Sequence, residues 1–398
     1  MGETRSGGRH REFAWLWVWL ALVLSIAVGT GVAVLLWGAT RAEHRDAFDT
    51  GWKSAAAVLA ILAAVVTVER LRLGQREHHR QLAADRAKQD ADRAAQITDL
   101  SAKAGEQLGS DKAAVRIGGL TDLERLAQSY PDLRQTVVDR ICAYLRAPYR
   151  LPTGDEVARS DGGAADAEIA ARRLELDVRR TAQQVLKRHL RWEDKAEGAP
   201  ASFWDGVTLD LRDAVLHEFD LGGARLASAD FRNARFSGPT SFERVSLTHE
   251  ALFTGAVFAG RTTFDNAAFA DEAWFDQVSF AEYTWFGSAS FEATALFRHT
   301  TFGEEAVFSG ASFADTCSFA GVEFGGAAVF ARASFAQDSS FKGASFAKSP
   351  VFDRASFRAL VTFSEATVTD AEDPPEWPTG RAEPQVPVVA ESAVLPEN

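Results

Sequence analysis

Residue types that often carry catalysis are scattered in this chain, and no group of them has the spacing of a known site. His217, His249 and His299 lie far apart in the sequence, and the acidic pairs Asp271-Glu272 and Glu304-Glu305 are typical of solvated turns. The sequence has no glycine-rich phosphate loop, no HExxH or GxSxG motif and no Asp-rich calcium loop. We therefore expect no catalytic activity, no metal and no other cofactor.

The cysteines and the adjacent pair of histidines also predict no redox or metal site. Cys142 and Cys317 are the only cysteines, so the chain has neither a disulfide framework nor a CxxC metal motif. Cys317 lies two positions before a large apolar residue, where the pattern described below favours a small buried side chain. His78 and His79 are neighbours in a helical segment and point to different faces of it, which does not suit a shared metal ion.

The large apolar residues of the second half recur at fixed intervals. From Phe231 to Phe363 the interval alternates between five and six residues, and the position two before each large residue is usually small, as at Ala256 and Ala289. Neither the helical period of 3.6 nor the strand period of two gives this spacing. A fixed period over so many residues is typical of a repeat architecture.

Four successive intervals sum to 22 residues, so every fourth large residue falls in one column. If each interval forms one side of a square coil, identical rings stack along the coil axis, and this predicts a parallel β-solenoid. We expect two such columns to form the structural core: Phe231, Phe253, Phe275, Phe297, Phe319, Phe341 and Phe363 in the first, and Phe242, Phe264, Phe286, Phe308, Phe330 and Phe352 in the second.

Upstream of Phe236 the spacing is five throughout. Segments such as residues 224–228 (ARLAS) and 229–233 (ADFRN) resemble the pentapeptide repeat family. The resemblance implies a right-handed quadrilateral parallel β-helix over residues 203–369, with each Leu or Phe and the small residue two before it facing inward. The later six-residue intervals depart from the family pattern, and we interpret the sixth residue as a corner insertion on alternate sides.

The first apolar run of the chain predicts a transmembrane helix. No charged residue occurs from Phe13 to Thr40, and tryptophans lie near both ends of this run. The competing interpretation is a signal peptide, whose apolar region of about 7–15 residues would be far shorter. We expect a membrane span at about 13–38.

A second apolar run, Ser54 to Val68, predicts another span at about 52–68, with a helix lying on the membrane or packed under the first span as the alternative. Arginines are more numerous outside the two runs than in the loop between them, so both termini are expected in the cytoplasm. Residues 1–68 would then anchor a multi-pass protein in the cell membrane and contact its lipid.

Residues 69–200 are predicted to be a cytoplasmic helical region. A polar helix is followed by a HEAT-like hairpin of two amphipathic helices, at about 110–127 and 133–145, and by a third helix at about 166–192. We expect the third helix to pack on the hairpin and cap the first coil, because an open β-helix end exposes unpaired strand edges. The hairpin segment also resembles a block that precedes the solenoid in membrane-anchored actinobacterial pentapeptide repeat proteins.

Charge and composition limit the kind of partner. Residues 203–369 contain 12 basic and 21 acidic side chains, a balance of −9, which disfavours direct binding of nucleic acid and allows a basic protein partner. Residues 370–398 combine prolines with acidic residues and are expected to form a disordered tail. A homo-oligomer is compatible with these features.

The predicted fold class is thus α+β, in which transmembrane helices and a helical region precede the β-helix. We expect a membrane-tethered cytoplasmic scaffold that binds an unknown protein partner and has no catalytic activity. The alternative is a DNA-mimicking modulator of a DNA gyrase-type topoisomerase, because some pentapeptide repeat proteins resemble a B-DNA rod. The membrane anchor and arginines such as Arg298 and Arg332 within the acidic surface disfavour it. An enzyme is the third alternative, and no residue constellation supports it.

Overall fold

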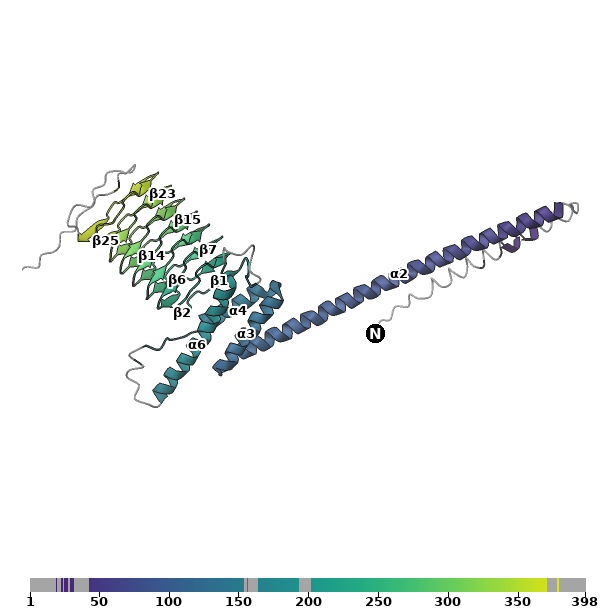
Figure 1. Ribbon diagram of the computed structural model, residues 1–398, viewed down its shortest axis with the longest axis horizontal. Helices are drawn as coiled ribbons and strands as arrows, with labels where there is room; N and C mark the ends of the chain where they lie inside the picture. Colours follow the sequence, from purple (N-terminus) through teal and green to yellow (C-terminus); the bar gives the residue numbers. More distant parts are fainter. Residues whose placement is uncertain are drawn as a thin grey trace, which may run out of the picture. The chain divides into compact units, whose positions relative to one another are not determined.

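The structure is a computed structural model that describes residues 43–153, 164–192 and 202–370, with the isolated positions 19, 23, 25–27, 29–31, 156 and 378. The chain divides into two compact units, residues 1–95 and residues 96–398. Helix α2 spans Glu43–Leu108 (Figure 1), and the strands and the helices described below, from residue 113 onward, belong to the second unit. The predicted disordered tail at 370–398 lies almost entirely outside the described residues.

The prediction of a multi-pass membrane protein is wrong. Within the part of the chain that the structure describes, no helix combines the length and the apolar character that crossing a bilayer requires. The apolar part of α2 is the run from Ser54 to Val68, which is shorter than the ~20 residues of a typical span and is bounded by Lys53 and Glu69. Most of the first predicted span, 13–38, lies outside the described residues. The fold is therefore a helical N-terminal region followed by a β-solenoid.

Among the described residues, three α-helices and a short 3-10 helix follow α2, and the α-helices pack on one another. Helix α3 spans Ala113–Ser129, the 3-10 helix η1 spans Pro131–Leu133, α4 spans Arg134–Arg146 and α6 spans Ala164–Leu190. The apolar face of each contributes to one core, whose buried members include Leu123, Ile141 and Leu186. Figure 1 shows these helices at the end of the solenoid where β1 and β2 lie.

The solenoid has four walls, each a parallel sheet, which we number in the order in which the chain reaches them. The strands of wall 1 are β1 (Thr208–Asp210), β4 (Ser228–Asp230), β8 (Ala251–Leu252), β12 (Ala273–Trp274), β16 (Ala295–Leu296), β20 (Cys317–Ser318), β24 (Ser339–Ser340) and β27 (Val361–Thr362). Those of wall 2 are β2 (Val215–His217), β5 (Arg235–Ser237), β9 (Val257–Phe258), β13 (Ser279–Phe280), β17 (Thr301–Phe302), β21 (Glu323–Phe324), β25 (Ser345–Lys348) and β28 (Thr367–Asp370).

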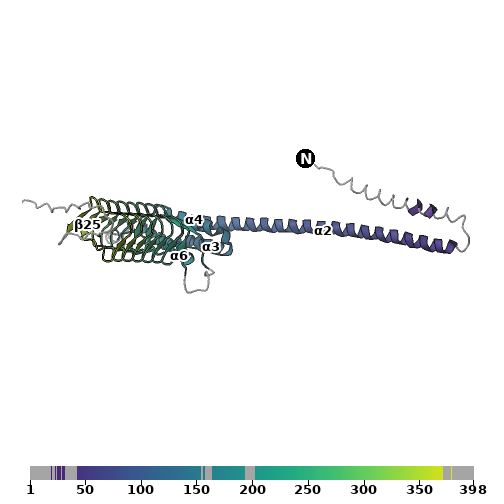
Figure 2. The ribbon, with the colours of Figure 1, turned by 90° about the horizontal axis from the view of Figure 1, so that it is seen from above.

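Wall 3 lies opposite wall 1, and wall 4 lies opposite wall 2. The strands of wall 3 are β6 (Thr240–Ser241), β10 (Thr262–Thr263), β14 (Thr284–Trp285), β18 (Ala306–Val307) and β22 (Ala328–Val329). Those of wall 4 are β3 (Arg225–Leu226), β7 (Ser246–Leu247), β11 (Ala268–Phe269), β15 (Ser290–Phe291), β19 (Ser312–Phe313), β23 (Ser334–Phe335) and β26 (Ser356–Phe357). The result is a β-solenoid of about seven turns, whose stacked coils are visible in Figure 2.

The strand register follows the spacing of the apolar residues. In the first coils Thr208 pairs with Ser228, a shift of 20 residues, whereas Thr262 pairs with Thr284, a shift of 22. The change corresponds to the change from five-residue spacing to alternating spacing. The six-residue intervals connect wall 2 to wall 3 and wall 4 to wall 1, so the longer corners lie on alternate sides of the coil.

The five-residue intervals close in a β-turn. After Phe231 the backbone N–H of Ala234 donates to the carbonyl oxygen of Phe231 at 3.0 Å, and the turn residue Asn233 has a φ of 58°. Positive φ recurs at the same corner of later coils, for example at His299 (56°) and Gly321 (65°). These are positions where glycine and asparagine are favoured, because a Cβ is strained there.

Phenylalanine rings fill the interior of the coil. In the first column Phe275 stacks on Phe297 with centroids 4.8 Å apart, and in the second Phe264 stacks on Phe286 at 4.6 Å. The residues of the two columns are at most 8 % exposed except Phe352, which is half-buried. Hydrophobic burial along an uninterrupted stack of rings therefore holds the coils together.

Candidate interaction surface

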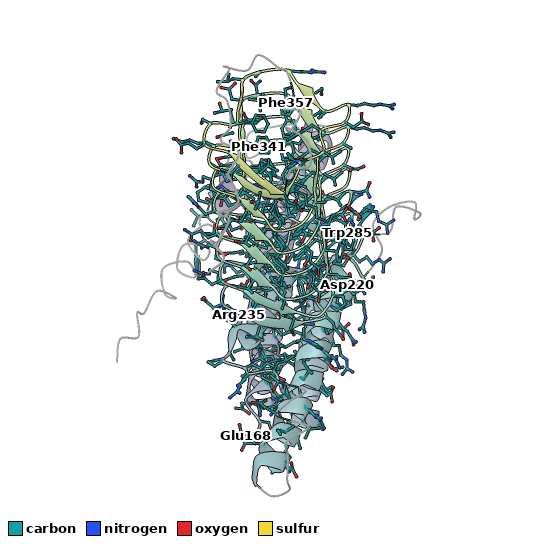
Figure 3. The ribbon with its side chains drawn as sticks, turned by 90° about the vertical axis from the view of Figure 1, so that its left-hand side faces the viewer. Glu168, Asp220, Arg235, Trp285, Phe341 and Phe357 are labelled. Atoms are coloured by element: carbon teal, nitrogen blue, oxygen red, sulfur yellow. The ribbon has the colours of Figure 1, made fainter. Side chains whose placement is uncertain are left out.

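The interior of the solenoid is occupied by packed side chains, so its distinctive chemistry lies on the outside. The residues two positions before each large residue point inward beside the rings. Examples are Ala273 and Thr284, which are both at most 1 % exposed. The positions directly before each large residue point outward, because successive strand residues alternate between the two faces of a sheet. Figure 3 shows the contrast between Phe341, which lies within the coil, and Trp285, which lies on its outer side.

Wall 1 presents a row of large apolar side chains along three successive coils. Leu252, Trp274 and Leu296 occupy equivalent outward positions on paired strands. Trp274 is 37 % exposed, and its indole Nε1–H donates to Glu272 Oε2 at 2.9 Å. The row ends at Ser318, after which the outward residues of the wall are small and polar.

Wall 3 carries a different outward row, formed by Trp285, Val307, Val329 and Val351. The ring of Tyr283 lies beside that of Trp285, with centroids 5.9 Å apart and an interplanar angle of 15°. Walls 1 and 3 thus each expose aromatic and aliphatic side chains on a rigid sheet.

Walls 2 and 4 are smoother over the middle coils. Their outward residues in the strands are mostly small, and include Ser279 and Thr301 on wall 2 and Ala268, Ser290 and Ser312 on wall 4. Successive coils approach one another closely at some corners next to wall 2, and only a small residue fits there. A Cβ on Gly303 would lie 2.7 Å from the carbonyl oxygen of Ala281 in the preceding coil, which is too close for an unstrained contact. The four walls therefore differ in shape and chemistry.

A row of carboxylates borders wall 1 at its corner with wall 4. Five successive coils contribute to it, and its members are Glu250, Asp271, Glu272, Glu292, Asp315 and Asp338, which we call the acidic rim. Within the described part of the chain, none of them forms an ion pair with a basic side chain. Their hydrogen-bond partners are neutral groups, such as the Ser290 hydroxyl, which donates to Glu292 Oε1 at 2.6 Å.

Elsewhere on the solenoid, acidic side chains do pair with arginines. The guanidinium Nε of Arg298 lies 3.1 Å from Asp276 Oδ2 of the preceding coil, and this contact raises the pKa of Arg298. Arg232 Nη2 donates to Asp230 Oδ2 at 2.7 Å. Arg146 of α4 and Arg212 both contact Asp210, and their hydrogen bonds hold the pKa of that carboxyl well below its usual range in spite of partial burial. The carboxylates of the acidic rim differ in this respect from Asp210, Asp230 and Asp276.

A basic recess lies at the N-terminal end of wall 4. It has a volume of about 870 Å³, and its lining includes Arg191, Arg225 and Arg244. The guanidinium carbon of Arg225 lies 4.1 Å from the ring centroid of Trp192, which is cation–π geometry.

The helical region covers the first coil, but through two helices rather than the one expected. Gln135 of α4 donates to the carbonyl oxygen of Thr208 at 3.0 Å, and Gln183 of α6 donates to that of His217 at 2.9 Å. The sequence could not assign α4 to this role. The apolar stripe of α4 is equally consistent with a helix that packs only against its partner in the hairpin.

His189 connects α3, α6 and the start of the solenoid. Its ring is 3 % exposed and stacks on the indole of Trp204, with centroids 4.1 Å apart. Its Nε2 lies 2.7 Å from Glu124 Oε1 and its Nδ1 lies 2.6 Å from the carbonyl oxygen of Ser202, so both ring nitrogens face acceptors. Sequence reasoning missed this contact, although a histidine within the apolar stripe of α6 was a signal for it.

The other residues considered as chemical candidates do not form a site. His217, His249 and His299 belong to different coils, and Nδ1 of His217 lies 2.9 Å from the hydroxyl oxygen of Ser237. Cys142 and Cys317 are buried, and burial raises the pKa of each thiol to about 12. Among the described residues, no group of three or more His, Cys, Asp or Glu side chains could hold a metal ion.

The outward tryptophans were not identified from the sequence as surface residues, although their position directly before a core phenylalanine was a signal for it. Trp274 precedes Phe275 and Trp285 precedes Phe286, so alternation within a strand places the indoles outside when the phenyl rings are inside.

Comparison with known proteins agrees with this architecture. Residues 210–238 match a family model described as Pentapeptide repeats, with eight copies, and no curated protein or solved structure matches the chain. The match does not include the helical region. The resemblance of that region to membrane-anchored actinobacterial proteins is therefore not tested by this comparison. The pentapeptide repeat solenoid is a typically non-catalytic fold. The repeat match and the four-walled β-solenoid together support the pentapeptide repeat family for this chain.

Proposed function

We propose that this protein is a non-catalytic scaffold that binds a partner protein on the outer walls of its solenoid. The observation that carries the proposal is the pair of outward rows on walls 1 and 3, which contain Trp274 and Trp285 respectively. Exposed apolar side chains gathered on a rigid surface are typical of sites where proteins bind other proteins, and tryptophan is enriched at the centres of such sites.

Rigidity supports the same proposal. The core is a continuous stack of rings, and each strand pairs with the strands of the coils before and after it, so a wall is already in its binding conformation before a partner arrives. A preorganised surface loses little conformational entropy on binding. Such a surface can present a fixed spacing of side chains without any catalytic group.

Site-specific photo-crosslinking in cells tests the proposal. A photoreactive amino acid at position 274 or 285 is expected to capture one or a few specific proteins. The same amino acid at Ser279, on the smoother wall 2, serves as the control. Equal labelling at all three positions, or no protein product from walls 1 and 3, would contradict a scaffold role.

DNA mimicry ranks second. It is supported by the −9 balance of residues 203–369, but a mimic needs a continuous negative surface, and Arg232 and Arg298 neutralise carboxylates on the corner between walls 1 and 2. A supercoiling assay with DNA gyrase separates the two functions. Inhibition at a protein concentration comparable to that of the enzyme would place mimicry first.

A further inference from the structure

We propose that wall 1 binds a segment of a partner protein that is rich in lysine and arginine and also presents apolar side chains. This inference rests on the proposed scaffold function and assigns it a surface and a class of partner. It combines two features of one wall: the apolar row Leu252, Trp274 and Leu296, and the acidic rim at its border with wall 4.

The two features lie side by side. Glu250 and Glu272 stand two positions before Leu252 and Trp274 in the same strand direction, so each carboxylate points to the same side as the apolar residue that follows it. The bond from Trp274 Nε1 to Glu272 Oε2 shows this directly. Since adjacent coils are ~4.8 Å apart, a segment bound along the wall meets a carboxylate at every coil while its apolar side chains cover the row.

Charge complementarity identifies the occupant. The carboxylates of the rim are half-buried or exposed and have no basic partner among the described residues, unlike Asp230 at the end of β4 and Asp276 at the corner with wall 2. Lysine and arginine side chains can supply the missing partners and can also pack against an indole through their methylene stems and cationic heads. A nucleic acid, whose phosphates would face the rim, is repelled.

Wall 3 does not offer the same combination. Its apolar row is longer, but the carboxylates at its corner with wall 2 are Glu282, Glu304 and Glu305 on two coils only, and Arg261 Nε already lies 4.0 Å from Glu282 Oε2. Wall 3 therefore provides a control surface on the same molecule, with an indole in an outward position but with carboxylates on only two coils at its corner with wall 2.

The test measures binding of labelled peptides to the full-length protein by fluorescence anisotropy. The probe is a twelve-residue peptide of alternating lysine and leucine. Two further peptides carry serine in place of leucine or glutamate in place of lysine. We expect the lysine-leucine peptide to bind most tightly, and its affinity to fall steeply as salt screens the rim.

Two sets of variants locate the binding surface. On wall 1, Trp274→Ala and the combination Glu250→Gln, Glu272→Gln, Glu292→Gln and Asp315→Asn should each weaken binding by about tenfold or more, as for the loss of central contacts in an interface. On wall 3, Trp285→Ala and the combination Glu282→Gln, Glu304→Gln and Glu305→Gln should change the affinity by less than about twofold. Equal losses from both walls, or binding of the three peptides with equal affinity, would overturn the proposal.

Crosslinking separates this inference from the scaffold function. If position 285 captures a specific protein and position 274 does not, a scaffold role stands and docking on wall 1 is wrong. If neither position captures a protein, both fail. Capture at position 274 of a protein whose crosslinked segment is rich in lysine and arginine supports both, whereas a neutral or acidic crosslinked segment overturns the assignment of the partner.

Discussion

The phenyl rings of Phe275 and Phe286 meet edge to face in the centre of the coil, with centroids 5.4 Å apart and an interplanar angle of 88°. Phe275 belongs to the first column and Phe286 to the second, so the two columns interlock across the interior from walls 1 and 3. The same geometry recurs between Phe264 and Phe275, at 5.4 Å and 90°. Each ring thus stacks on its neighbours along the axis and meets rings of the opposite column edge to face. In the edge-to-face contacts the positive edge of one ring meets the negative face of the other, which is electrostatically favourable.

Truncation of Phe286 tests the importance of this interlock. Phe286→Ala should lower the free energy of unfolding by about 3–5 kcal/mol, because it removes a fully buried ring and leaves a cavity between two coils. Phe286→Leu should have a smaller effect. Guanidinium unfolding monitored by circular dichroism measures both. Trp285→Ala, on the outer face of the same strand, is the control, and equal destabilisation by the two alanine variants would contradict an inward Phe286.

Gly321 provides a test of the corner geometry. Its φ is +65°, and a Cβ there would lie 2.7 Å from Nδ1 of His299, whereas at Gly343, with a φ of +64°, a Cβ would meet nothing within 4 Å. Gly343→Ala should therefore reflect only the backbone strain, about 1–2 kcal/mol, and Gly321→Ala should be more destabilising than that. Thermal unfolding of both variants checks the order. Adding His299→Ala to Gly321→Ala should remove the difference; persistence of the difference would show that the imidazole is not its cause.

Glu124 should make the cap sensitive to acid. Burial raises the pKa of Glu124, but hydrogen bonds from His189 and Arg188 outweigh it, and the net shift is below the ordinary value of 4.5. The folded protein thus binds this proton less readily than the unfolded chain does. The stabilising contribution is fully present above pH 4.5 and is lost as the pH falls through the lower pKa of the folded state.

Comparison with Glu124→Gln tests this dependence. The melting temperature of the native protein should exceed that of the variant near neutral pH, and the difference should shrink as the pH is lowered below 4.5. Glu304→Gln, which changes an exposed carboxyl on the solenoid, should show no such convergence. A difference between native protein and Glu124→Gln that stays constant with pH would contradict the role of the carboxylate.

The two thiols should be protected in the folded protein. Cys142 and Cys317 are 1 % and 4 % exposed, and with pKa values of about 12 almost no thiolate is present at pH 8. We expect neither to react with Ellman's reagent in the native state and both to react in guanidinium. Ser349→Cys adds an exposed thiol as the positive control. Rapid reaction of two thiols in the native protein would show that the packing around them is open.

Arg179 should be the most sensitive polar residue of the cap. It is 3 % exposed, and its guanidinium donates to the carbonyl oxygens of Leu145 at 2.9 Å and Ala147 at 2.7 Å, at the C-terminal end of α4. Arg179→Met leaves these acceptors without their donor and should destabilise the protein by about 2–3 kcal/mol. Arg173→Met, on the exposed side of the same helix, should have little effect. Chemical unfolding of the two variants measures the difference.

The sequence by itself determined which residues of the solenoid face inward and how the coils align. A slip of one residue would turn a side chain such as Phe286 outward and Trp285 inward, so the spacing of five and six admits one register. The same spacing locates the longer corners. Equivalent strands of successive coils stay paired 22 residues apart, so the sixth residue of a longer interval has to lie in a corner and not within a strand.

The tertiary structure decided how the helical cap meets the solenoid and which charges remain unpaired. Apolar stripes identified the helices, but many packing angles bury such stripes equally well, so the contact of α4 with β1, the position of Arg179 and the stacking of His189 on Trp204 could not be derived. Likewise, Asp276 pairs with Arg298 because of how their long side chains lie across adjacent coils, whereas Glu292 finds no such partner. The apolar run from Ser54 to Val68 does not make α2 a candidate membrane span, because the run is short and lies between Lys53 and Glu69 in a longer, largely polar helix.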